Sequence, residues 1–529
     1  MKTDEFDVII IGGGITGAGT QRDCAMRGLR TLLVERSDIA TGASGRNHGL
    51  LHSGARYATS DEASARECIG ENRILRRIAS HCIEETGGLF ITLPEDDPAY
   101  QQVFVDACRK VGIGAEVVDP RLAHRWEPSV NPELTGAVLV PDASVDPFRL
   151  CSANMLDAKL RGGQVRLHTE VTGFIREGDT IRGIHTRNRQ SGEEKDFYAR
   201  IVVNAAGIWG RQVAAMAGIP LAMHPSKGSL LIFARRVNAL VLNRCRMPSN
   251  ADILVPGDGF CIVGTTSSRI AFEECDNVSV TPDEVDLLIT EGSKLAPALS
   301  STRILRAYAG VRPLVSADED PSGRNIPRGF VVLDHESRDG VQGLITIAGG
   351  KLTTYRLMAE KVTDLICRKL DNKKKCRTAA VPLPGSEEES YEAVAQKIWE
   401  ESPSPVQKAD LGTRAFPMRS SDRWNDAVVC RCKDVSVGEI NDAIERLAAS
   451  SLTDLRRRTG LGMGPCQGEY CACRAAGLLA MSHGCIERER EDLTFFLQER
   501  WKGIFPVGWG DALREAEYTQ WLYKSVLGL

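Results

Sequence analysis

The sequence lacks a strong excess of charge of either sign. Its 529 residues include 66 Lys and Arg against 70 Asp and Glu, which gives a formal net charge of −4. Proteins that bind nucleic acid usually present a clear excess of basic residues. The composition therefore excludes nucleic acid as an expected partner.

Long hydrophobic runs and a secretory leader are also missing. No stretch reaches the roughly 18 apolar residues that a transmembrane helix needs. The first residues include Asp4, Glu5 and Asp7 where a signal peptide requires positive charge, and the short apolar run that follows ends in glycines. We expect a cytoplasmic protein whose membrane contacts are peripheral.

Cysteine is scarce overall but unevenly distributed. The 16 cysteines are too few for a disulfide scaffold, and five of them lie between Cys430 and Cys473. Because disulfides are rare in the cytoplasm and thiolates bind metals, this clustering predicts a metal centre.

The chain divides into four parts by composition and pattern. Residues 1–380 alternate strand-like and helical stretches, which is typical of an α/β domain with an inserted sheet. Residues 381–425 predict a polar linker around one short helix at 391–401, and residues 426–486 a small Cys-bearing unit with two helical patterns. Residues 487–529 contain Trp501, Trp509 and Trp521, which either pack on the tail's own domain or form a surface for a partner protein.

A glycine-rich motif follows the first predicted strand. Gly12, Gly14 and Gly17 form a Gly-x-Gly-x-x-Gly sequence, a helix is expected from about residue 15 to 27, and the next strand ends at Glu35. In such a βαβ unit the glycines permit a tight turn and bring a pyrophosphate close to the helix N-terminus, while the acid accepts a ribose hydrogen bond. The unit predicts a dinucleotide site.

The type of dinucleotide follows from the rest of the chain. No second motif of this kind has a strand and a helix around it, which favours a flavin reduced directly by substrate over a flavin reduced by NAD(P)H. A predicted strand from Gly343 to Gly350 is followed by Lys351 and a helix. A helix N-terminus beside a lysine would stabilise the negative charge of a reduced flavin, although a simple β-α turn would look the same.

Several segments together resemble the FAD-dependent glycerol-3-phosphate dehydrogenases. They are DVIIIGGGITGAGTQRDCAMRGLRTLLVERSDIATGASGRNHGLLHSGARY, VVNAAGIWG, KGSLLIF, CIVGTTSSR, LRAYAGVRPL and AGGKLTTYR. With the Cys-bearing unit added, the chain is similar to the large A subunit of the anaerobic members of this family. The resemblance implies a Rossmann-like FAD-binding domain with a β-sheet substrate cap, of the glutathione-reductase and D-amino-acid-oxidase type, followed by a small α-helical iron–sulfur domain and a helical tail.

The resemblance also implies which residues bind FAD. They belong to the glycine motif, the ribose-binding acid, the loop that precedes HSGARY, and the segments around VVNAAG and AGGKLTT. The expected contacts are Gly12, Gly14, Gly17, Glu35, Arg36, Ser44, Asn47, His48, Gly49, Val171, Ala206, Gly207, Gly350, Lys351, Leu352 and Thr353.

A phosphorylated polyol needs cations for its phosphate and a base for its hydroxyl proton. The segment HSGARY offers His52, Arg56 and Tyr57, AGVRPL offers Arg312, and GGKLTTYR offers Lys351. By resemblance, the two arginines contact the phosphate and hydroxyls, the lysine lies near flavin and substrate, and His52 is the expected base. Taken singly, each of these residues could be structural.

One departure from the family weakens this transfer. The single-subunit relatives tend to have a histidine after Lys-Gly-Ser, whereas this chain has Leu230. Any catalytic work of that histidine must be done here by another group, such as His52. His48 could instead lie against the flavin, and the sequence does not rank the two histidines.

The cysteines form two pairs of close spacing. Cys430 and Cys432 are followed after 33 residues by Cys466 and Cys471, and Cys473 is left over. By resemblance this unit is a bacterioferritin-associated-ferredoxin-like domain with a [2Fe-2S] cluster; four thiolates would also suit zinc. The run at 456–458, Arg-Arg-Arg, is expected to be a solvated helix face.

The resemblance implies that the protein oxidises sn-glycerol 3-phosphate to dihydroxyacetone phosphate with FAD. The cluster would pass the electrons to partner subunits, one of them attached to the inner face of the cell membrane, and so to a quinone in anaerobic respiration. Two alternatives stay open: a flavin-dependent amino-acid or opine dehydrogenase, and a non-catalytic iron–sulfur or zinc scaffold. Stoichiometry, and FMN as a second flavin of the complex, also stay open.

Overall fold

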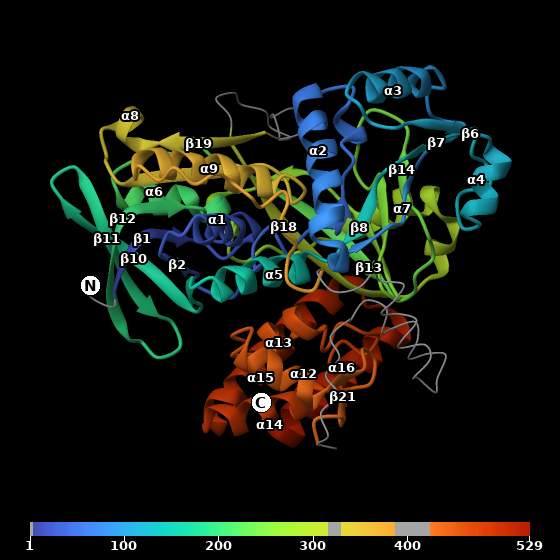
Figure 1. The fold of residues 1–529 in the computed structure, drawn as a ribbon. Coiled ribbons are helices and arrows are strands. Elements are labelled where there is room, and N and C mark those ends of the chain that lie inside the picture. The colour runs from blue at the N-terminus through green and yellow to red at the C-terminus, as the bar shows by residue number, and fades with distance from the viewer. Residues whose placement is uncertain (1–3, 316–328, 387–423, 529) are drawn as a thin grey trace.

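A mixed eight-stranded sheet forms the centre of the N-terminal domain in the computed structural model, which describes residues 4–315, 329–386 and 424–528 (Figure 1). The path through this sheet is β10 (Thr169–Glu177), β11 (Thr180–Asn188), β12 (Glu194–Asn204), β1 (Glu5–Ile11), β2 (Thr31–Val34) and β9 (Gln164–Arg166). Strand β20 (Leu344–Gly349) pairs with β12 and with β19 (Phe330–Asp334).

The first strand explains why the sheet is buried on both faces. Its apolar residues from Val8 to Ile11 are at most 5% exposed, and β1 pairs in parallel with β12 and with β2. Parallel strands need crossover helices, and these cover the faces of such a sheet. The helices of this domain are α1 (Ile15–Met26), α5 (Pro147–Leu160), α6 (Gly210–Met216), α8 (His335–Asp339) and α9 (Tyr355–Lys369).

The helix predicted after the glycine motif is α1. Gly14 is its N-cap residue, and Gly28, at φ +78°, follows its last turn. A β-carbon on Gly17 would lie 1.9 Å from the Gly12 carbonyl oxygen, so only glycine allows α1 to approach β1 this closely.

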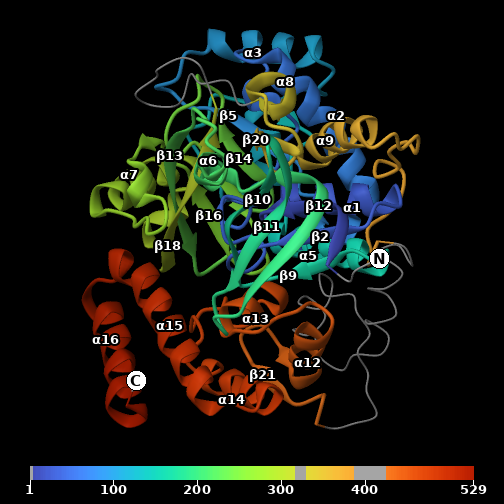
Figure 2. The same ribbon diagram turned by 90° about the vertical axis from the view of Figure 1, so that its left-hand side faces the viewer.

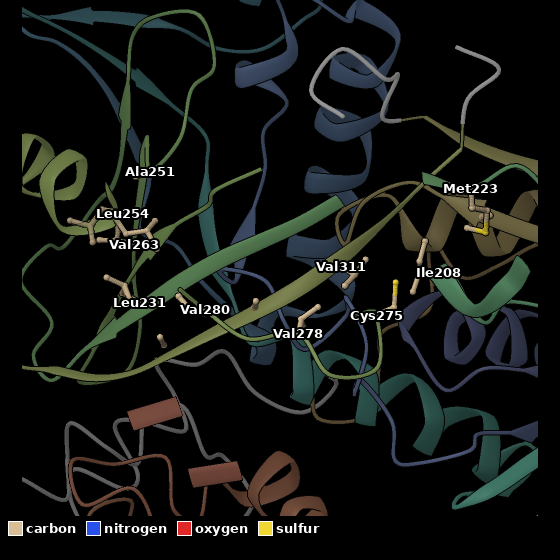
Figure 3. Close-up of a cluster of buried hydrophobic side chains, with 14 of the residues drawn as sticks. Ile208, Met223, Leu231, Ala251, Leu254, Val263, Cys275, Val278, Val280 and Val311 are labelled. Carbon is tan, nitrogen blue, oxygen red and sulfur yellow. The ribbon is translucent and has the colours of Figure 1, made fainter. Parts of the chain in front are cut away.

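A nine-stranded sheet forms the predicted cap. Its strands are β17 (Ser268–Arg269), β13 (His224–Phe233), β16 (Cys261–Gly264), β15 (Ile253–Pro256), β14 (Val241–Arg244), β5 (Gly88–Thr92), β7 (Gly136–Val140) and β6 (Glu116–Val118), with β18 (Ile304–Leu314) paired to β13. The cap carries α2 (Glu62–Ile78), α3 (Ala99–Lys110), α4 (Pro120–Trp126) and α7 (Pro282–Leu295). Figure 3 shows aliphatic side chains from this region, such as Leu231, Val263 and Val311, which belong to the largest buried cluster.

Short elements complete the N-terminal domain. A small sheet consists of β3 (Leu50–Leu51), β8 (Ala143–Val145) and β4 (Ile83–Glu84). The 3₁₀ turns are η1 (Ala55–Tyr57), η2 (Ser80–Cys82), η3 (Gly207–Trp209), η4 (Phe272–Glu274) and η5 (Pro297–Ser301).

The C-terminal domain, residues 424–528, is mainly helical. It contains β21 (Val428–Cys430), β22 (Val435–Ser436), α12 (Val437–Glu445), α13 (Leu452–Thr459), α14 (Ala472–His483), α15 (Ile486–Ile504), η6 (Phe505–Val507) and α16 (Gly510–Leu527). Helix α13 contacts α5, while α15 and η6 contact β18, so this domain lies against both the central part and the cap (Figure 2).

The tail shares its core with the Cys-bearing unit. Helix α15 begins at Ile486, and its residues Leu493, Phe496 and Leu497 are buried in one cluster with Tyr523 of α16 and the residues around the cysteines. The tail therefore packs on the unit that precedes it. The helix predicted at 391–401 lies outside the described residues. Among the described helices, none combines the length and the apolar character needed to cross a membrane.

Candidate active site

A cavity of about 2560 Å³ lies between the central sheet, the cap and the C-terminal domain. A pocket for one drug-sized ligand is usually about 300–1,000 Å³. The cavity is lined by most of the residues predicted to bind FAD, namely Gly12, Gly14, Glu35, Arg36, Ser44, Asn47, His48, Gly49, Val171, Ala206, Gly207, Gly350, Lys351 and Leu352. The two others lie just outside its wall: Gly17 in the contact of α1 with β1, and Thr353, whose hydroxyl accepts a hydrogen bond from the His52 backbone.

The phosphate end of the cavity fits a dinucleotide. Gly12 has φ +114°, and a β-carbon there would lie 2.6 Å from the Ala205 carbonyl oxygen. At the start of α1 the Ile15 N–H donates to Ser44 Oγ at 3.0 Å, and Gly14 caps the helix with no side chain in the way. The positive end of the helix dipole thus faces the cavity at the place where a pyrophosphate would lie.

Glu35 occupies the position of the ribose-binding acid. Its two carboxylate oxygens accept backbone N–H groups of Gly13 at 2.7 Å and Ser37 at 2.8 Å. Burial raises the pKa of this carboxyl, and the two backbone hydrogen bonds oppose the rise. These bonds fix the side chain at the cavity wall, where remaining lone pairs can accept a hydroxyl.

The loop after β20 forms the other end of the cavity. Gly349 and Gly350 both have positive φ, at +83° and +75°, and a β-carbon on Gly350 would collide with Met358 of α9. The helix itself begins only at Tyr355, because Lys351 to Thr354 form a turn in which the Lys351 N–H donates to the Thr354 hydroxyl at 3.1 Å. Lys351 is therefore a loop residue of the cavity wall.

The structure brings the predicted substrate residues into one connected set. The rings of His48 and His52 lie 5.6 Å apart, and those of His52 and Tyr57 lie 5.5 Å apart. The ammonium group of Lys351 lies 4.8 Å from the centre of the Tyr57 ring. The set meets the large cavity through His48 and Lys351, whereas His52, Arg56, Tyr57 and Arg312 are not part of its wall.

The two predicted arginines of this set are held by different partners. Arg56 forms an ion pair of 3.2 Å with Asp252, which is fully buried, but its second terminal nitrogen, Nη1, is buried without a partner among the described residues. Arg312 donates to the Thr265 hydroxyl and, at 3.0 Å, to the Thr266 carbonyl.

His48 is neutral at physiological pH. Burial, with smaller contributions from the charges of Arg312 and Arg56, lowers the pKa of His48 from 6.5 to about 3. Its Nδ1 atom is buried and makes no hydrogen bond within the described part of the chain. In residues 4–315, 329–386 and 424–528, therefore, neither this uncharged imidazole nitrogen nor the second nitrogen of Arg56 has a partner.

The residues that support these groups were not predicted from the sequence. Asp252 orients Arg56, and Thr265 lies in the segment CIVGTTSSR, which carried the family resemblance. Lys227 of Lys-Gly-Ser pairs with Glu284 at 2.8 Å, which fixes it beside the strand that holds Arg312. The motif segments signalled Lys227 and Thr265, whereas no local pattern singled out Asp252.

The four cysteines come together across the two sequence motifs. The Cys432 and Cys466 sulfurs lie 3.5 Å apart, and Cys430 forms its sulfur–sulfur hydrogen bond with Cys471. No group of three or more potential ligands in metal-binding geometry is found among the described residues. Two separate pairs suit a two-iron centre, in which each iron takes two thiolates, better than a single zinc ion that draws four thiolates together.

The surroundings of Cys430 favour its thiolate. The Cys471 thiol donates to the Cys430 sulfur, as do backbone N–H groups of the loops around both motifs, and together they lower the pKa of Cys430 although burial opposes this. Cys430 and Cys471 are buried, while Cys432 and Cys466 are half-buried. Cys473 makes a side-chain hydrogen bond with Tyr523, away from both pairs.

The arginine run is not the solvated helix face that the sequence predicted. Arg458 is fully buried, and both Arg457 and Arg458 pair with Asp38, which is itself fully buried in the N-terminal domain. The prediction was wrong because α13 packs against another domain rather than against solvent.

Known proteins resemble the chain over its whole length. A family model described as FAD dependent oxidoreductase matches residues 7–356, and one for the BFD-like [2Fe-2S] binding domain matches residues 428–481. The A subunit of the anaerobic glycerol-3-phosphate dehydrogenase of Escherichia coli (strain K12) is 58% identical over 536 residues, which cover 100% of this chain and 98% of that protein. The A1 subunit of the same enzyme from Haloferax volcanii is 42% identical, with 98% and 90% covered.

A solved structure shares the fold. The glycerol-3-phosphate dehydrogenase from Bacillus halodurans, complexed with FAD, superposes with a TM-score of 0.70 at 22% identity, and the match covers 97% of each chain. FAD and a [2Fe-2S] cluster are thus the cofactors of the two domains. The chain belongs to the FAD-dependent oxidoreductases, and within them to the family formed by the A subunits of anaerobic glycerol-3-phosphate dehydrogenases.

Proposed function

We propose that the chain oxidises sn-glycerol 3-phosphate to dihydroxyacetone phosphate in the set formed by His48, His52, Arg56, Lys351 and Arg312. The observation that carries the proposal is a pair of buried atoms without partners among the described residues, Arg56 Nη1 and His48 Nδ1. His48 lines the cavity that fits FAD, and Arg56 belongs to the set of residues behind it. Buried polar atoms are normally satisfied, so these two are available to a polar substrate.

The cations of the site bind the phosphate end of the substrate. Arg56 offers its second terminal nitrogen while Asp252 fixes its position, and Arg312 is oriented by neutral acceptors in the loop between β16 and β17. Charge-assisted hydrogen bonds of this kind are stronger than those between neutral groups. They would hold the substrate carbon next to the flavin end of the cavity, at Lys351.

His52 is the proposed base. A general base works best when its pKa lies near the operating pH, and the pKa of about 3 makes His48 a weak proton acceptor. His48 would instead orient the substrate hydroxyl through its neutral ring, while His52, next to it, takes the hydroxyl proton. The bound FAD supplies the acceptor for the hydride that leaves the adjacent carbon.

Cys430, Cys432, Cys466 and Cys471 are the proposed ligands of the cluster. The half-buried pair Cys432 and Cys466, with Tyr470 67% exposed beside them, gives the electrons a short way to the protein surface. The electrons would leave one at a time to partner subunits of a multi-subunit dehydrogenase, and from a membrane-attached partner to a quinone.

The tail is the proposed docking surface for a partner protein of this complex. Helices α15 and α16 and the turn between them expose large apolar side chains, which soluble proteins seldom leave uncovered. Those more than half exposed are Ile486, Phe495, Phe505, Trp509, Tyr518, Trp521 and Val526. Through such a partner the chain would be attached to the inner, cytoplasmic face of the cell membrane.

Anaerobic mixing of the purified protein with substrate tests the activity directly. Glycerol 3-phosphate should bleach the flavin absorbance, whereas amino acids should not. Arg56→Ala and Arg312→Ala should each lower kcat/KM for glycerol 3-phosphate by a factor that corresponds to about 1.5–3 kcal/mol, since a hydrogen bond to a charged group is lost. Equal losses with plain glycerol would show that these arginines maintain the fold and do not bind phosphate.

A further inference from the structure

Three arginines from distant parts of the chain converge where the C-terminal domain meets β18. Arg46 lies in the loop after Ser44, Arg306 on β18 and Arg456 on α13, and all three line the large cavity. Desolvation lowers the pKa of each guanidinium, most strongly that of Arg456. We call these three residues the interdomain arginines.

The interdomain arginines have no carboxylate partner in the described part of the chain. Within residues 4–315, 329–386 and 424–528 none of them forms an ion pair. Arg306 donates to the backbone carbonyl of Glu499 at 3.4 Å, Arg456 donates to the Gln467 side chain at 3.2 Å, and the Arg46 side chain makes no hydrogen bond with any described residue. The negative charge of the Glu499 carboxylate acts to raise the pKa of all three arginines. Lys502, whose pKa Glu499 also acts to raise, is a further cation at this place.

All three arginines are half-buried and line the cavity, so their charge is neither neutralised by a carboxylate nor fully exposed to bulk water. On one side, β18 carries Arg306, Tyr308 and Arg312 on one face, because side chains at every second position of a strand point the same way. Tyr308 donates to the Asn47 carbonyl at 2.7 Å, which fixes the loop of Arg46 and His48 along β18. The strand thus connects the substrate residues with the C-terminal domain.

On the other side, Arg456 touches the cysteine loops. Its partner Gln467 follows Cys466 directly and also donates to the carbonyls of Met463 and Gly464 in the same loop. Cys471 is among the groups whose charge acts on Arg456. The arginines therefore lie between the flavin end of the cavity and the sulfur atoms of the cluster site.

We propose that Arg46, Arg306 and Arg456 form a cationic bridge that raises the reduction potential of the [2Fe-2S] cluster and so favours electron transfer from flavin to cluster. This inference rests on the proposed function, in which the substrate gives up two electrons with its hydride. Two successive transfers would each move one electron from the reduced flavin to the cluster, and the proton that came with the hydride would be released to solvent. In each transfer a ferric ion of the cluster would become ferrous, which adds one negative charge, and a partner protein would reoxidise it by taking the electron.

Fixed positive charge stabilises the more negative, reduced form, and the effect is stronger between half-buried groups than in bulk water. Arg456 is a positioning residue in this scheme: it makes no bond to iron or flavin and acts through its charge. Removing its charge should therefore shift the reduction equilibrium of the cluster while leaving the cluster in place.

The test is a redox titration of the holoenzyme with dithionite and mediators, in which the EPR signal of the reduced cluster is measured. Arg456→Gln should make the cluster at least tenfold harder to reduce, which is 59 mV for a one-electron couple. Arg456→Lys should stay near the wild-type value. Arg474→Gln is the matched control, because Arg474 lies directly after Cys473 in the same domain but is exposed, so solvent screens its charge.

Arg306→Gln gives a second measurement from the other domain. It should lower the cluster potential in the same direction while cluster content stays the same, even if Arg456→Gln fails to fold. An unchanged or higher potential in Arg306→Gln, or shifts no larger than that of Arg474→Gln, would overturn the proposal. Because dithionite replaces the substrate, failure of glycerol 3-phosphate to reduce the flavin would contradict the proposed function and leave this measurement valid.

Discussion

Asp38 is one of the residues that hold the cysteine-bearing domain on the FAD domain, together with His168 and Asp258, which pair with Asp454 and Lys433. Its carboxylate accepts Arg457 Nε at 2.5 Å and Arg458 Nη1 and Nη2 at 2.9 and 2.5 Å. Arg457 also pairs with Asp454 at 3.1 Å. Asp38 lies three residues after Glu35, so one short segment contains both the predicted ribose-binding acid and the partner of α13.

Asp38→Asn removes the charge and keeps the size of the side chain. It would leave Arg458, which has no exposed side-chain surface, with a hydrogen bond to the Leu447 carbonyl and no carboxylate. Removing one partner of a buried ion pair costs about 3–5 kcal/mol. At about 1.4 kcal/mol for each factor of ten, the equilibrium between docked and undocked domains should shift by about two to three and a half powers of ten.

Thermal unfolding observed at two wavelengths measures this shift. Cluster absorbance reports the C-terminal domain and flavin fluorescence the N-terminal domain. We expect one common transition in the wild type, and in Asp38→Asn a cluster transition at clearly lower temperature than the flavin transition. Asp442→Asn is the control, since it breaks a surface pair with Arg446 that is worth about 0.3–0.5 kcal/mol. A single, unshifted transition in Asp38→Asn would refute the reasoning.

Three further predictions concern the cluster, pH and the tail. Cys430→Ser should abolish the iron and acid-labile sulfide of the purified protein while the flavin stays reducible. Cys473→Ser should retain the iron and the sulfide. Iron retained in Cys430→Ser would show that Cys430 is not a ligand. Because the unfolded chain binds a proton at His48 below pH 6.5 and the folded chain only near pH 3, the free energy of unfolding should fall as pH drops through this range. His48→Gln should flatten that fall in denaturant titrations between pH 6.5 and 4, and an unchanged slope would contradict the buried, neutral imidazole. Trp521→Glu should leave substrate-driven flavin bleaching intact but lower quinone reduction with partner-containing membranes. Trp126→Glu, in α4 of the N-terminal domain, should leave both activities unchanged. Equal losses of quinone reduction in the two variants would argue against docking at the tail.

Much of the fold was visible in the sequence because its signals are local. The strand at Val8–Ile11, the glycines that follow and the end of α1 before Gly28 are all dictated by neighbours in the chain. The spacing of the cysteine motifs predicted a metal centre, since each motif needs only a short loop, whereas the choice of a [2Fe-2S] cluster over zinc came from the family resemblance. The local signals therefore predicted the βαβ unit and a centre with four thiolates.

Contacts between distant segments could not be read in this way. The thiol pairs each combine one cysteine from either motif, and the Arg458–Asp38 contact joins residues 420 positions apart. An arginine-rich helix has the same local pattern whether it faces water or a buried carboxylate. Only the packing of α13 against the N-terminal domain decided between them, because burial and the position of the partner charge are properties of the tertiary structure.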